Sequence, residues 1–492
     1  MRGEQHGGLR VLHTSLVAPS SSSPEEELSI PLTYLDAIWL SSPPVERVLF
    51  YRRRDADDAD EIISNLRRSL SHALGAFFPL AGLLRPAPHT PNRYELHYNK
   101  KQGAGVSFTV AEYDDDGGFG FGLDLDDAGG RRELSKMRPL VPTLPEDGAV
   151  LALQATLLTT TGMIALGVTV HHAACDGAAS TRFLHTWAAA AAGCNNNNNN
   201  NQYAQGPPPP LLDRSIIRER KDIHDLFTSL DASSNLFTQQ ESSSGSSTSS
   251  STLLVMASFT LSKAQLQSIK DKVAREAERR GVPPPRCTST VAAFGFVWQG
   301  HCRVTQQGQG DEEDRARAYF YFSIDHRPRL DPPVPETYLG NCVGPCFASA
   351  PRKEIKADLF TACASVAAAI DEAVRGEPDY WAATRWMERL MEAYSGGAQQ
   401  PLSVAGSPRF RVYDLDFGFG RPAKVDIVSV ARTGAFSVAE SPSAPGGGIE
   451  VGICLPPDAM DRFATCFADG IACLSSSLSS PPPPDHHTSS VA

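Results

Sequence analysis

Two stretches near the middle of the 492-residue chain are too polar and too repetitive to lie in a packed core. Residues 193–210 hold seven consecutive asparagines and four consecutive prolines, and residues 241–252 are almost entirely serine and threonine. Segments of this composition bury too little apolar surface to offset the entropy lost on ordering. The chain is therefore expected to divide into an N-terminal domain of residues 1–192, a low-complexity connection of residues 193–252, a C-terminal domain of residues 253–474 and a disordered tail of residues 475–492.

The composition supports globular domains and excludes several classes of function. Hydrophobic residues make up 41% of the chain and charged residues 21%, which is enough apolar material for a large core. With a net charge of −11, the chain lacks the excess of basic residues that favours binding to nucleic acid or to an anionic membrane surface, so neither is expected as a partner. We see no signal peptide and no membrane-spanning stretch. The ten cysteines are sparse and irregularly spaced, which predicts reduced thiols without a metal site in a cytoplasmic protein.

Helical and strand patterns alternate irregularly in both halves, which predicts an α/β fold with mixed sheets. Residues 150–158 and 163–170 are apolar runs separated by a Thr-Gly turn, so they are expected to form a hairpin. Ser262 and Gln265 form a capping-box pattern at the start of a helix that runs to about Arg280. The Gly/Asp-rich residues 114–132 are expected to form a loop outside the core. Other expected elements are helices at 60–76, 178–192, 290–303, 353–375, 379–394 and 458–474, and strands at 318–324, 424–430 and 449–455.

The sequence His172-Ala-Ala-Cys-Asp176-Gly177 follows the hairpin, at a position where α/β proteins usually carry functional loops. A neutral imidazole can accept a proton near pH 7, because its unperturbed pKa is about 6.5. An aspartate four residues later, followed by a glycine that permits a sharp turn, is suited to holding the loop that aims the ring. His171 is less suited, because it lies five residues before Asp176. By itself the pattern also fits a solvated turn, or a core histidine bonded to a backbone carbonyl.

A second candidate motif, Asp416-Phe-Gly-Phe-Gly420, lies near the end of the C-terminal half. Asp-Phe-Gly is part of the protein-kinase pattern, but a kinase also needs a Gly-rich loop, a strand lysine and a His-Arg-Asp catalytic loop upstream. The first two have no counterpart in this chain, and Asp325-His326-Arg327 has the third in the wrong order. A kinase is therefore excluded, and the two glycines alone indicate only a bend with close backbone approach.

Taken together, in this order and about 240 residues apart, the two motifs resemble the HxxxDG and DFGWG motifs of the plant BAHD acyl-CoA-dependent acyltransferases. The resemblance covers most of the chain. Further similar segments are residues 30–44 (the N-terminal signature of the family), 78–82 (its FYPLAG element), and, for the branch of anthocyanin and flavonoid glucoside malonyltransferases, 338–342 (YLGNC), 424–429 and 432–434. One departure is Phe419, where the family has tryptophan. Phenylalanine suits this position if the side chain only packs, but it lacks an indole N–H donor.

The resemblance implies two similarly sized α/β domains, each with a mixed β-sheet flanked by helices as in chloramphenicol acetyltransferase, and an active-site channel between them. It implies that His172 is the general base for an acceptor hydroxyl, which then attacks the thioester of an acyl-CoA directly. Asp176 would orient the loop, and Asp416 would be structural and paired with Arg327. Because no acyl-enzyme is needed, Cys175 is expected to be a small buried residue rather than a nucleophile.

The resemblance also points to residues that would bind the donor. Ser289 and Thr290, at the start of an expected helix, match a position where the malonyltransferase branch contacts the CoA arm; the alternative is a helix cap without a ligand. Arg182, the nearest cation after the motif, is the candidate for binding a malonyl carboxylate; the alternative is a solvated helix face.

The leading hypothesis is transfer of malonyl from malonyl-CoA to a sugar hydroxyl of a phenolic, flavonoid or anthocyanin glucoside. One alternative is a hydroxycinnamoyl-CoA acyltransferase that acts on a similar acceptor. Another is a non-catalytic relative that binds acyl-CoA, although the intact His172 and Asp176 argue against it. Acyl-CoA is expected as a co-substrate without any bound cofactor or metal, and the chain is expected to be a monomer.

Overall fold

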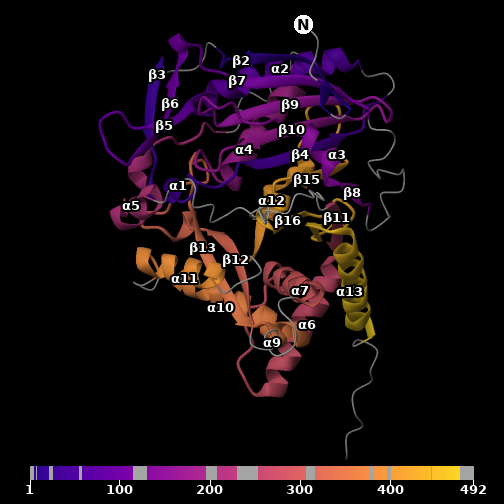
Figure 1. The fold of residues 1–492 in the computed structure, drawn as a ribbon. Coiled ribbons are helices and arrows are strands. Elements are labelled where there is room, and N and C mark those ends of the chain that lie inside the picture. Colours follow the sequence, from indigo (N-terminus) through magenta and orange to yellow (C-terminus); the bar gives the residue numbers. More distant parts are fainter. Residues whose placement is uncertain are drawn as a thin grey trace, which may run out of the picture.

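The computed structural model of the chain describes residues 5–6, 8–20, 26–54, 58–114, 130–195, 208–229, 253–305, 316–375, 380–395, 401–444 and 446–476. They form two seven-stranded mixed sheets and a smaller three-stranded sheet, with helices packed against them. Figure 1 shows the first sheet in the upper half of the molecule and the second sheet in the lower half. The expected α/β architecture of two mixed-sheet domains flanked by helices is confirmed.

The first sheet surrounds the hairpin that precedes the histidine motif. Its strands, in spatial order, are β1 (Gln5–His6), β2 (Leu9–Val17), β7 (Val106–Tyr113), β9 (Leu151–Leu158), β10 (Ile164–Val170), β4 (Val45–Tyr51) and β15 (Lys424–Ile427). β9 and β10 form the expected antiparallel hairpin. Nearly all their side chains are buried, which explains why both strands read as continuous apolar runs rather than as alternating ones.

The second sheet forms the centre of the lower half. Its strands, in spatial order, are β13 (Val343–Pro351), β12 (Arg317–Asp325), β14 (Leu402–Gly406), β16 (Ala435–Glu440), β17 (Ile449–Leu455), β11 (Val255–Leu261) and β8 (Arg132–Glu133). β14 is parallel to both of its neighbours, and the other pairs are antiparallel. The small sheet consists of β3 (Glu27–Pro31), β6 (Tyr94–Asn99) and β5 (Leu83–Pro86).

Each large sheet takes one strand from the other half of the sequence. β15 pairs with β4 in the first sheet, and β8 pairs with β11 in the second. Arg132 of β8 is buried, and its guanidinium donates to Asp426 of β15 at 3.0 Å. The expectation that residues up to 132 form a loop outside the core is therefore wrong for Arg132, because an ion pair between the exchanged strands holds it inside. The domain boundaries expected from the sequence stay a prediction.

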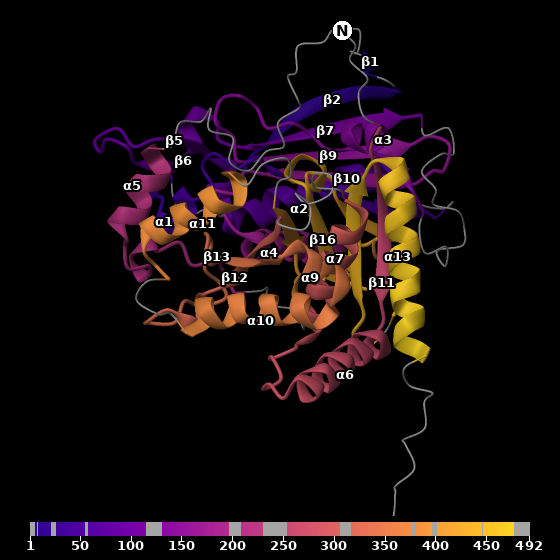
Figure 2. The ribbon, with the colours of Figure 1, turned by 60° about the horizontal axis from the view of Figure 1, so that its bottom comes forward.

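Helices cover the sheets and supply most of the remaining core. They are α1 (Tyr34–Ala37), α2 (Ala59–Ala76), α3 (Leu134–Met137), α4 (Gly177–Asn195), α5 (Lys221–Ser229), α6 (Lys263–Arg280), α7 (Ser289–Val304), α9 (Arg352–Ala357), α10 (Leu359–Arg375), α11 (Ala383–Ser395), α12 (Val430–Thr433) and α13 (Pro457–Ser476). Figure 2 shows α13 alongside β11. In the part of the chain that the structure describes, we find no helix long and apolar enough to span a bilayer.

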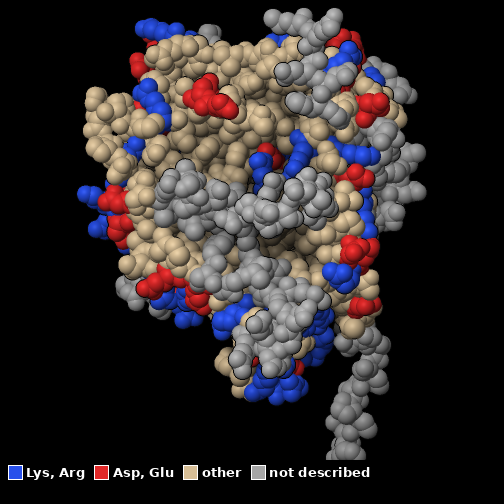
Figure 3. Space-filling model, in the orientation of Figure 1, with Lys and Arg blue, Asp and Glu red and all other residues tan. Residues whose placement is uncertain are grey.

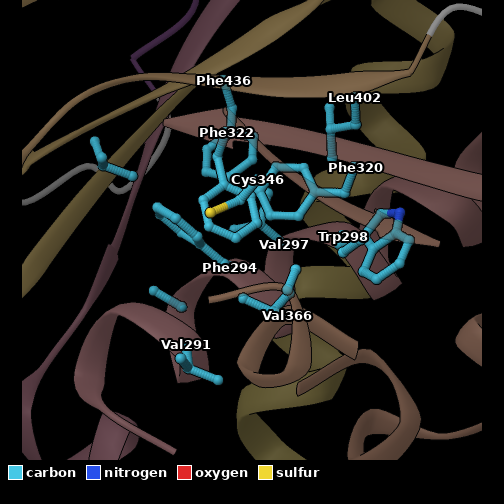
Figure 4. Packing of buried hydrophobic residues seen from close by; sticks show 14 of the residues in the cluster. Val291, Phe294, Val297, Trp298, Phe320, Phe322, Cys346, Val366, Leu402 and Phe436 are labelled. Atoms are coloured by element: carbon cyan, nitrogen blue, oxygen red, sulfur yellow. The ribbon is translucent and has the colours of Figure 1, made fainter. Parts of the chain in front are cut away.

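Aromatic side chains fill the core of the lower half between α7 and the second sheet (Figure 4). The ring of Phe294 lies edge-on to Phe320 and Phe436, with centroids 5.5 and 5.8 Å apart. Edge-to-face pairs of this kind add to the free energy gained by burying the rings. Gly295 lets α10 approach closely, since a Cβ there would lie 2.5 Å from the sulfur of Cys363.

Two helices illustrate how local sequence sets the boundaries. α6 begins at the expected capping box of Ser262 and Gln265 and ends at Gly281, which has a φ of 68°. Its basic residues contribute to the Lys and Arg side chains that gather at the lower end of the molecule in Figure 3.

The single helix expected over residues 353–375 is wrong, because Asp358 is extended and its carboxylate accepts hydrogen bonds from the backbone of Phe360 and Thr361. It therefore separates α9 from α10.

The exchanged strands yield a stability prediction. Arg132→Ala is expected to lower the free energy of unfolding by about 3–5 kcal/mol, because Asp426 stays buried without its guanidinium partner. The adjacent Arg131 is a matched control, since its ion pair with Asp461 is solvent-exposed and is worth about 1 kcal/mol or less. Urea denaturation of both variants checks this, and equal losses would contradict a special role for the buried pair.

Candidate active site

The histidine motif begins where β10 ends. The backbone N–H of His171 still donates to the carbonyl of Val150, which extends the hairpin by one residue. The chain then turns, with Ala174 N–H donating to the His171 carbonyl, and α4 begins at Gly177. His172 therefore lies in a short turn fixed at one end by a buried strand and at the other by a long helix.

Asp176 fixes this turn to the lower half of the molecule. Both of its oxygens accept from the guanidinium of Arg327, at 2.8 and 3.1 Å, and both residues are buried. The carboxylate also accepts from the backbone N–H of Ala179 in the first turn of α4 and from that of Cys342, each at 3.0 Å. With four donors around it, the Asp176 carboxylate is held as a structural anion that caps α4 and joins the two halves.

The expected pair of Asp416 and Arg327 is wrong. Arg327 binds Asp176 and Asp325 instead. Asp416 accepts from the backbone N–H groups of Gly418, at 2.8 Å, and Gly420, at 3.0 Å. Because both partners of Asp416 lie within four residues, it shapes the DFGFG bend by itself and needs no distant cation.

Asn341 fixes the orientation of the His172 ring. The amide nitrogen of Asn341 donates to the His172 carbonyl at 2.9 Å and to a carboxylate oxygen of Asp36 at 3.0 Å. Both partners are acceptors, so the amide oxygen must be the atom that faces His172 Nδ1 at 3.1 Å. An oxygen there requires a proton on Nδ1. The hydrogen-bond pattern thus assigns the Nδ1–H tautomer, which leaves the lone pair on Nε2.

Asp36 in turn holds Asn341. One oxygen of Asp36 also accepts from the Asn341 backbone N–H at 2.8 Å, and the other accepts from the backbone and hydroxyl of Thr33 at 2.9 and 2.8 Å. The guanidinium of Arg214 lies 3.7 Å from the second oxygen and donates to the Leu339 carbonyl. Asp36 is buried, so these contacts replace the water that its charge would otherwise need.

Trp39 covers one face of the His172 ring. The two rings are stacked, with centroids 3.8 Å apart and planes inclined by 17°. Together, stacking on the face and a hydrogen bond at Nδ1 leave the imidazole little freedom to rotate. Within the described part of the chain, Nε2 forms no hydrogen bond, so it is the atom of the ring that can accept a proton from a bound molecule.

The electrostatics of the site favour a neutral His172. Burial lowers its pKa below the usual 6.5, and this effect outweighs the opposing influence of Asp176, Asn341 and Asp36. Burial also lowers the pKa of His171 to about 4, and its Nδ1 already accepts from Ala173 N–H at 3.2 Å. Burial raises the pKa of the Cys175 thiol, so this cysteine is no source of thiolate.

The residues expected to bind the donor lie at two other places. Ser289 is the first residue of α7, which Thr288 caps, and its hydroxyl receives a hydrogen bond from Lys270 of α6 at 2.9 Å. Thr290 follows it and is half-buried. Arg182 lies on α4 and its guanidinium donates to the Pro208 carbonyl at 2.7 Å. None of these three described residues forms a hydrogen bond or an ion pair with His172.

Phe419, the departure from the family motif, is buried. Its ring lies edge-on to Tyr51 at 5.0 Å and stacks with Phe417 at 6.4 Å. The phenylalanine thus takes part in an aromatic cluster against the first sheet, which is the behaviour of a packing residue.

Sequence reasoning found His172 and Asp176 but gave no role to Asp36, Trp39 or Asn341. All three lie inside segments that were singled out as family-like, residues 30–44 and 338–342. In the sequence, the feature that marks each of these three residues is a polar or large aromatic side chain among apolar neighbours. Their function depends on contacts across the fold, which no local spacing encodes.

Three comparisons with known proteins show what the chain is similar to in sequence and in fold. The model of the Transferase family matches residues 9–469. Over 93% of its length the chain is 30% identical to phenolic glucoside malonyltransferase 1 of Arabidopsis thaliana, covering 97% of that protein. It is 26% identical to coumaroyl-CoA:anthocyanidin 3-O-glucoside-6''-O-coumaroyltransferase 2 of the same plant, covering 94% of this chain and 97% of that one. The crystal structure of vinorine synthase superposes with a TM-score of 0.63 at 20% identity, covering 92% and 96% of the two chains.

The ion pair of Asp176 and Arg327 is testable with a double-mutant cycle. Asp176→Asn and Arg327→Met are each expected to lower the free energy of unfolding by about 3–5 kcal/mol, because each leaves a buried group without its partner. The double variant should lose clearly less than the two single losses combined.

Asp416→Ala supplies the control for this cycle. It removes two local backbone contacts and is expected to cost about 1–2 kcal/mol. Combined with Arg327→Met it should be additive within about 0.5 kcal/mol, because the two residues share no contact. Coupling of Arg327 to Asp416 rather than to Asp176, measured by urea denaturation, would contradict the assignment.

Proposed function

The chain belongs to the Transferase family of BAHD acyl-CoA-dependent acyltransferases, and we propose that it transfers malonyl from malonyl-CoA to a sugar hydroxyl of a phenolic, flavonoid or anthocyanin glucoside. The donor and acceptor classes are supported by the near full-length similarity to a phenolic glucoside malonyltransferase. Acyl-CoA is a co-substrate in this family and is consumed in the reaction.

The observation that carries the mechanism is the fixed orientation of His172. Asn341 and Trp39 hold the ring so that Nε2 is the free nitrogen, and burial keeps the ring neutral near pH 7. A general base needs this combination of an available lone pair and a pKa close to or below the working pH. We therefore assign His172 as the general base, with Nε2 as the reacting atom.

The proposed reaction proceeds by direct transfer. Nε2 of His172 removes the proton from the acceptor hydroxyl as its oxygen attacks the thioester carbonyl carbon. A new C–O bond forms, and the carbonyl electrons move to the oxygen in a tetrahedral intermediate. When the intermediate collapses, the C–S bond breaks and the CoA sulfur leaves as a thiolate, which takes the proton from the imidazolium. His172 returns to its neutral state, so no acyl-enzyme is formed.

The surrounding residues act on the base rather than on the substrates. Asp176 holds the turn through Arg327, and Asp36 holds Asn341 against the ring. Asp416 stabilises the DFGFG bend. Since a misplacement of about 1 Å can cost about 100-fold in rate, these residues are positioning residues in the proposed mechanism.

The donor contacts remain the ones expected from the sequence, namely Ser289, Thr290 and Arg182. The nearby Lys270 supports a role for Ser289, because a cation next to hydroxyls at a helix N-terminus suits a polar or anionic part of CoA. Arg182 remains the candidate for the malonyl carboxylate, provided that a donor breaks its hydrogen bond with Pro208.

A coumaroyl or related hydroxycinnamoyl donor is the second candidate. It is supported by the similarity to an anthocyanidin glucoside coumaroyltransferase at 26% identity. Such a donor is apolar where malonyl carries a charge, so the two candidates differ in whether the acyl site needs a cation. A monomeric state, a cytoplasmic location and the absence of a bound cofactor stay predictions from the sequence.

The proposed function is tested by incubating the protein with malonyl-CoA or coumaroyl-CoA and a flavonoid glucoside, and measuring free CoA thiol and product mass. Malonylated glucoside is the expected product. His172→Ala should lose about 100- to 10,000-fold in turnover with its fold intact, because only the base is removed. His171→Ala is the control and should lose far less. Wild-type-like turnover of His172→Ala would rule out the mechanism. If only the coumaroylated glucoside is formed, the donor is coumaroyl-CoA rather than malonyl-CoA.

The pH dependence of turnover is a separate prediction. The base works only when it is deprotonated, and burial lowers the pKa of His172 below 6.5. The rate should therefore fall at acidic pH in proportion to the neutral fraction of the ring, and it should reach half of its maximum only below about pH 6.5. A pH profile of kcat/KM for the acceptor checks this, and an acidic limb with an apparent pKa above 7 would contradict it.

A further inference from the structure

Arg47 is a buried cation without a hydrogen-bond partner among the described residues. It lies in the middle of β4, opposite Val168 of β10 and Ile427 of β15, and is 6% exposed. Its guanidinium donates to no described residue, and its Nε is fully enclosed. Burial lowers its pKa to about 10, so the group still carries a charge near pH 7. A buried guanidinium without a partner is costly in free energy.

Arg47 differs in this respect from the other buried arginines. Five arginines are buried in the described part of the chain, and four of them donate hydrogen bonds to protein atoms. These are Arg132 to Asp426, Arg214 to the Leu339 carbonyl, Arg327 to Asp176, and Arg352 to the Cys302 carbonyl. The Nε atoms of these four are buried without a described partner, as in Arg47, but each of the four donates at least one hydrogen bond from the rest of its guanidinium and Arg47 donates none.

Glu440, on the facing sheet, is partly buried and has one carboxylate oxygen without a partner in the described part of the chain. It is the last residue of β16, and its Oε1 accepts from the backbone N–H of Tyr413 at 2.7 Å. Its Oε2 is buried and accepts from no described residue. Arg47 and Glu440 attract each other electrostatically, but they form no hydrogen bond or ion pair. A donor and an acceptor of opposite charge therefore lie near each other with hydrogen-bonding capacity to spare.

The pair lies beside the segment that covers the end of the histidine motif. The short 3₁₀ helices η7 (Pro408–Phe410) and η8 (Val412–Asp414) connect the two places. The ring of Phe410 abuts Gly177, where an added Cβ would lie 2.6 Å from it, and Tyr413 of the same segment contacts Glu440. From the other side, Val168 beside Arg47 is four residues before His172 on the same chain.

We propose that Arg47 and Glu440 form a subsite for the sugar hydroxyls of the acceptor, an inference that rests on the proposed function. A hydroxyl group can accept from a guanidinium and donate to a carboxylate at once, so a polyhydroxylated ring satisfies both residues. A carboxylate ligand fits less well, because it pairs with Arg47 but repels Glu440. The opposite charges of the subsite thus favour the neutral glycoside over the charged end of a malonyl group.

The subsite is tested by isothermal titration calorimetry on the protein saturated with CoA, so that no turnover occurs. The probes are p-nitrophenyl β-D-glucopyranoside and its sugar-free counterpart, p-nitrophenol. We expect the wild type to bind the glucoside more tightly than the phenol. Arg47→Met and Glu440→Gln should each weaken glucoside binding by about 10-fold or more, the scale of a lost hydrogen bond to a charged group, and leave p-nitrophenol binding unchanged.

Arg432→Met is the matched control. Arg432 forms an ion pair with Glu46, the residue before Arg47 in β4, and is 40% exposed. Its loss should leave the affinity for the glucoside as in the wild type. If Arg47→Met fails to fold, as judged by thermal unfolding and by its affinity for CoA, Glu440→Gln decides the question, because it removes the charge and keeps the shape.

Three results would overturn the subsite. They are glucoside binding in both variants that equals the wild type, a wild type that binds the glucoside no better than p-nitrophenol, and variants that lose affinity for malonyl-CoA but not for the glucoside. A different set of results would show that the subsite exists but that the proposed function is wrong. The wild type would then bind the glucoside and the two variants would lose this binding, but the wild type would not acylate the glucoside when malonyl-CoA replaces CoA.

Discussion

One buried ion pair, between Asp176 and Arg327, holds the turn that carries His172 in place. Either charge alone would destabilise the fold, because each loses its hydration on burial and this costs several kcal/mol. The cost is offset only when the guanidinium and two backbone N–H groups, of Ala179 and Cys342, converge on the same carboxylate. Two of these donors come from the lower half and one from the upper. The turn that carries His172 is therefore fully satisfied only when both halves are assembled.

A second buried acid, Asp36, serves the same turn from the opposite side. Its partners come from three separate parts of the chain: Thr33, Arg214 and Asn341. Through Asn341 it controls which imidazole nitrogen carries the proton, and Trp39 controls the plane of the ring. The histidine therefore receives both its chemical state and its direction from residues that do not touch the reacting atoms. A rigid supporting shell of this kind is what the proposed role of His172 as a general base requires.

Local features could be predicted from the sequence, whereas distant partners could not. The hairpin of β9 and β10 and the capping box of α6 have causes within a few residues, and the structure contains both. The pairs Asp176–Arg327, His172–Asn341 and Asp36–Asn341 join residues 151, 169 and 305 positions apart. Arg327 was identified as a structural arginine but assigned to Asp416, because that pairing was carried over from the family resemblance. Hydrophobic periodicity also missed the break at Asp358, because a carboxylate that caps the next helix leaves the apolar spacing unchanged.

The exchange of β8 and β15 has a consequence for how the protein is made. During synthesis the N-terminal sheet emerges from the ribosome early, but the edge of β4 stays open until β15, near the other end of the chain, has been translated. An open edge strand readily pairs with other chains, and contacts between such distant segments form slowly. The two halves therefore do not fold as independent units in sequence. A newly made chain depends on β15 to close its first sheet, and truncation before Lys424 leaves an aggregation-prone edge open in the N-terminal half.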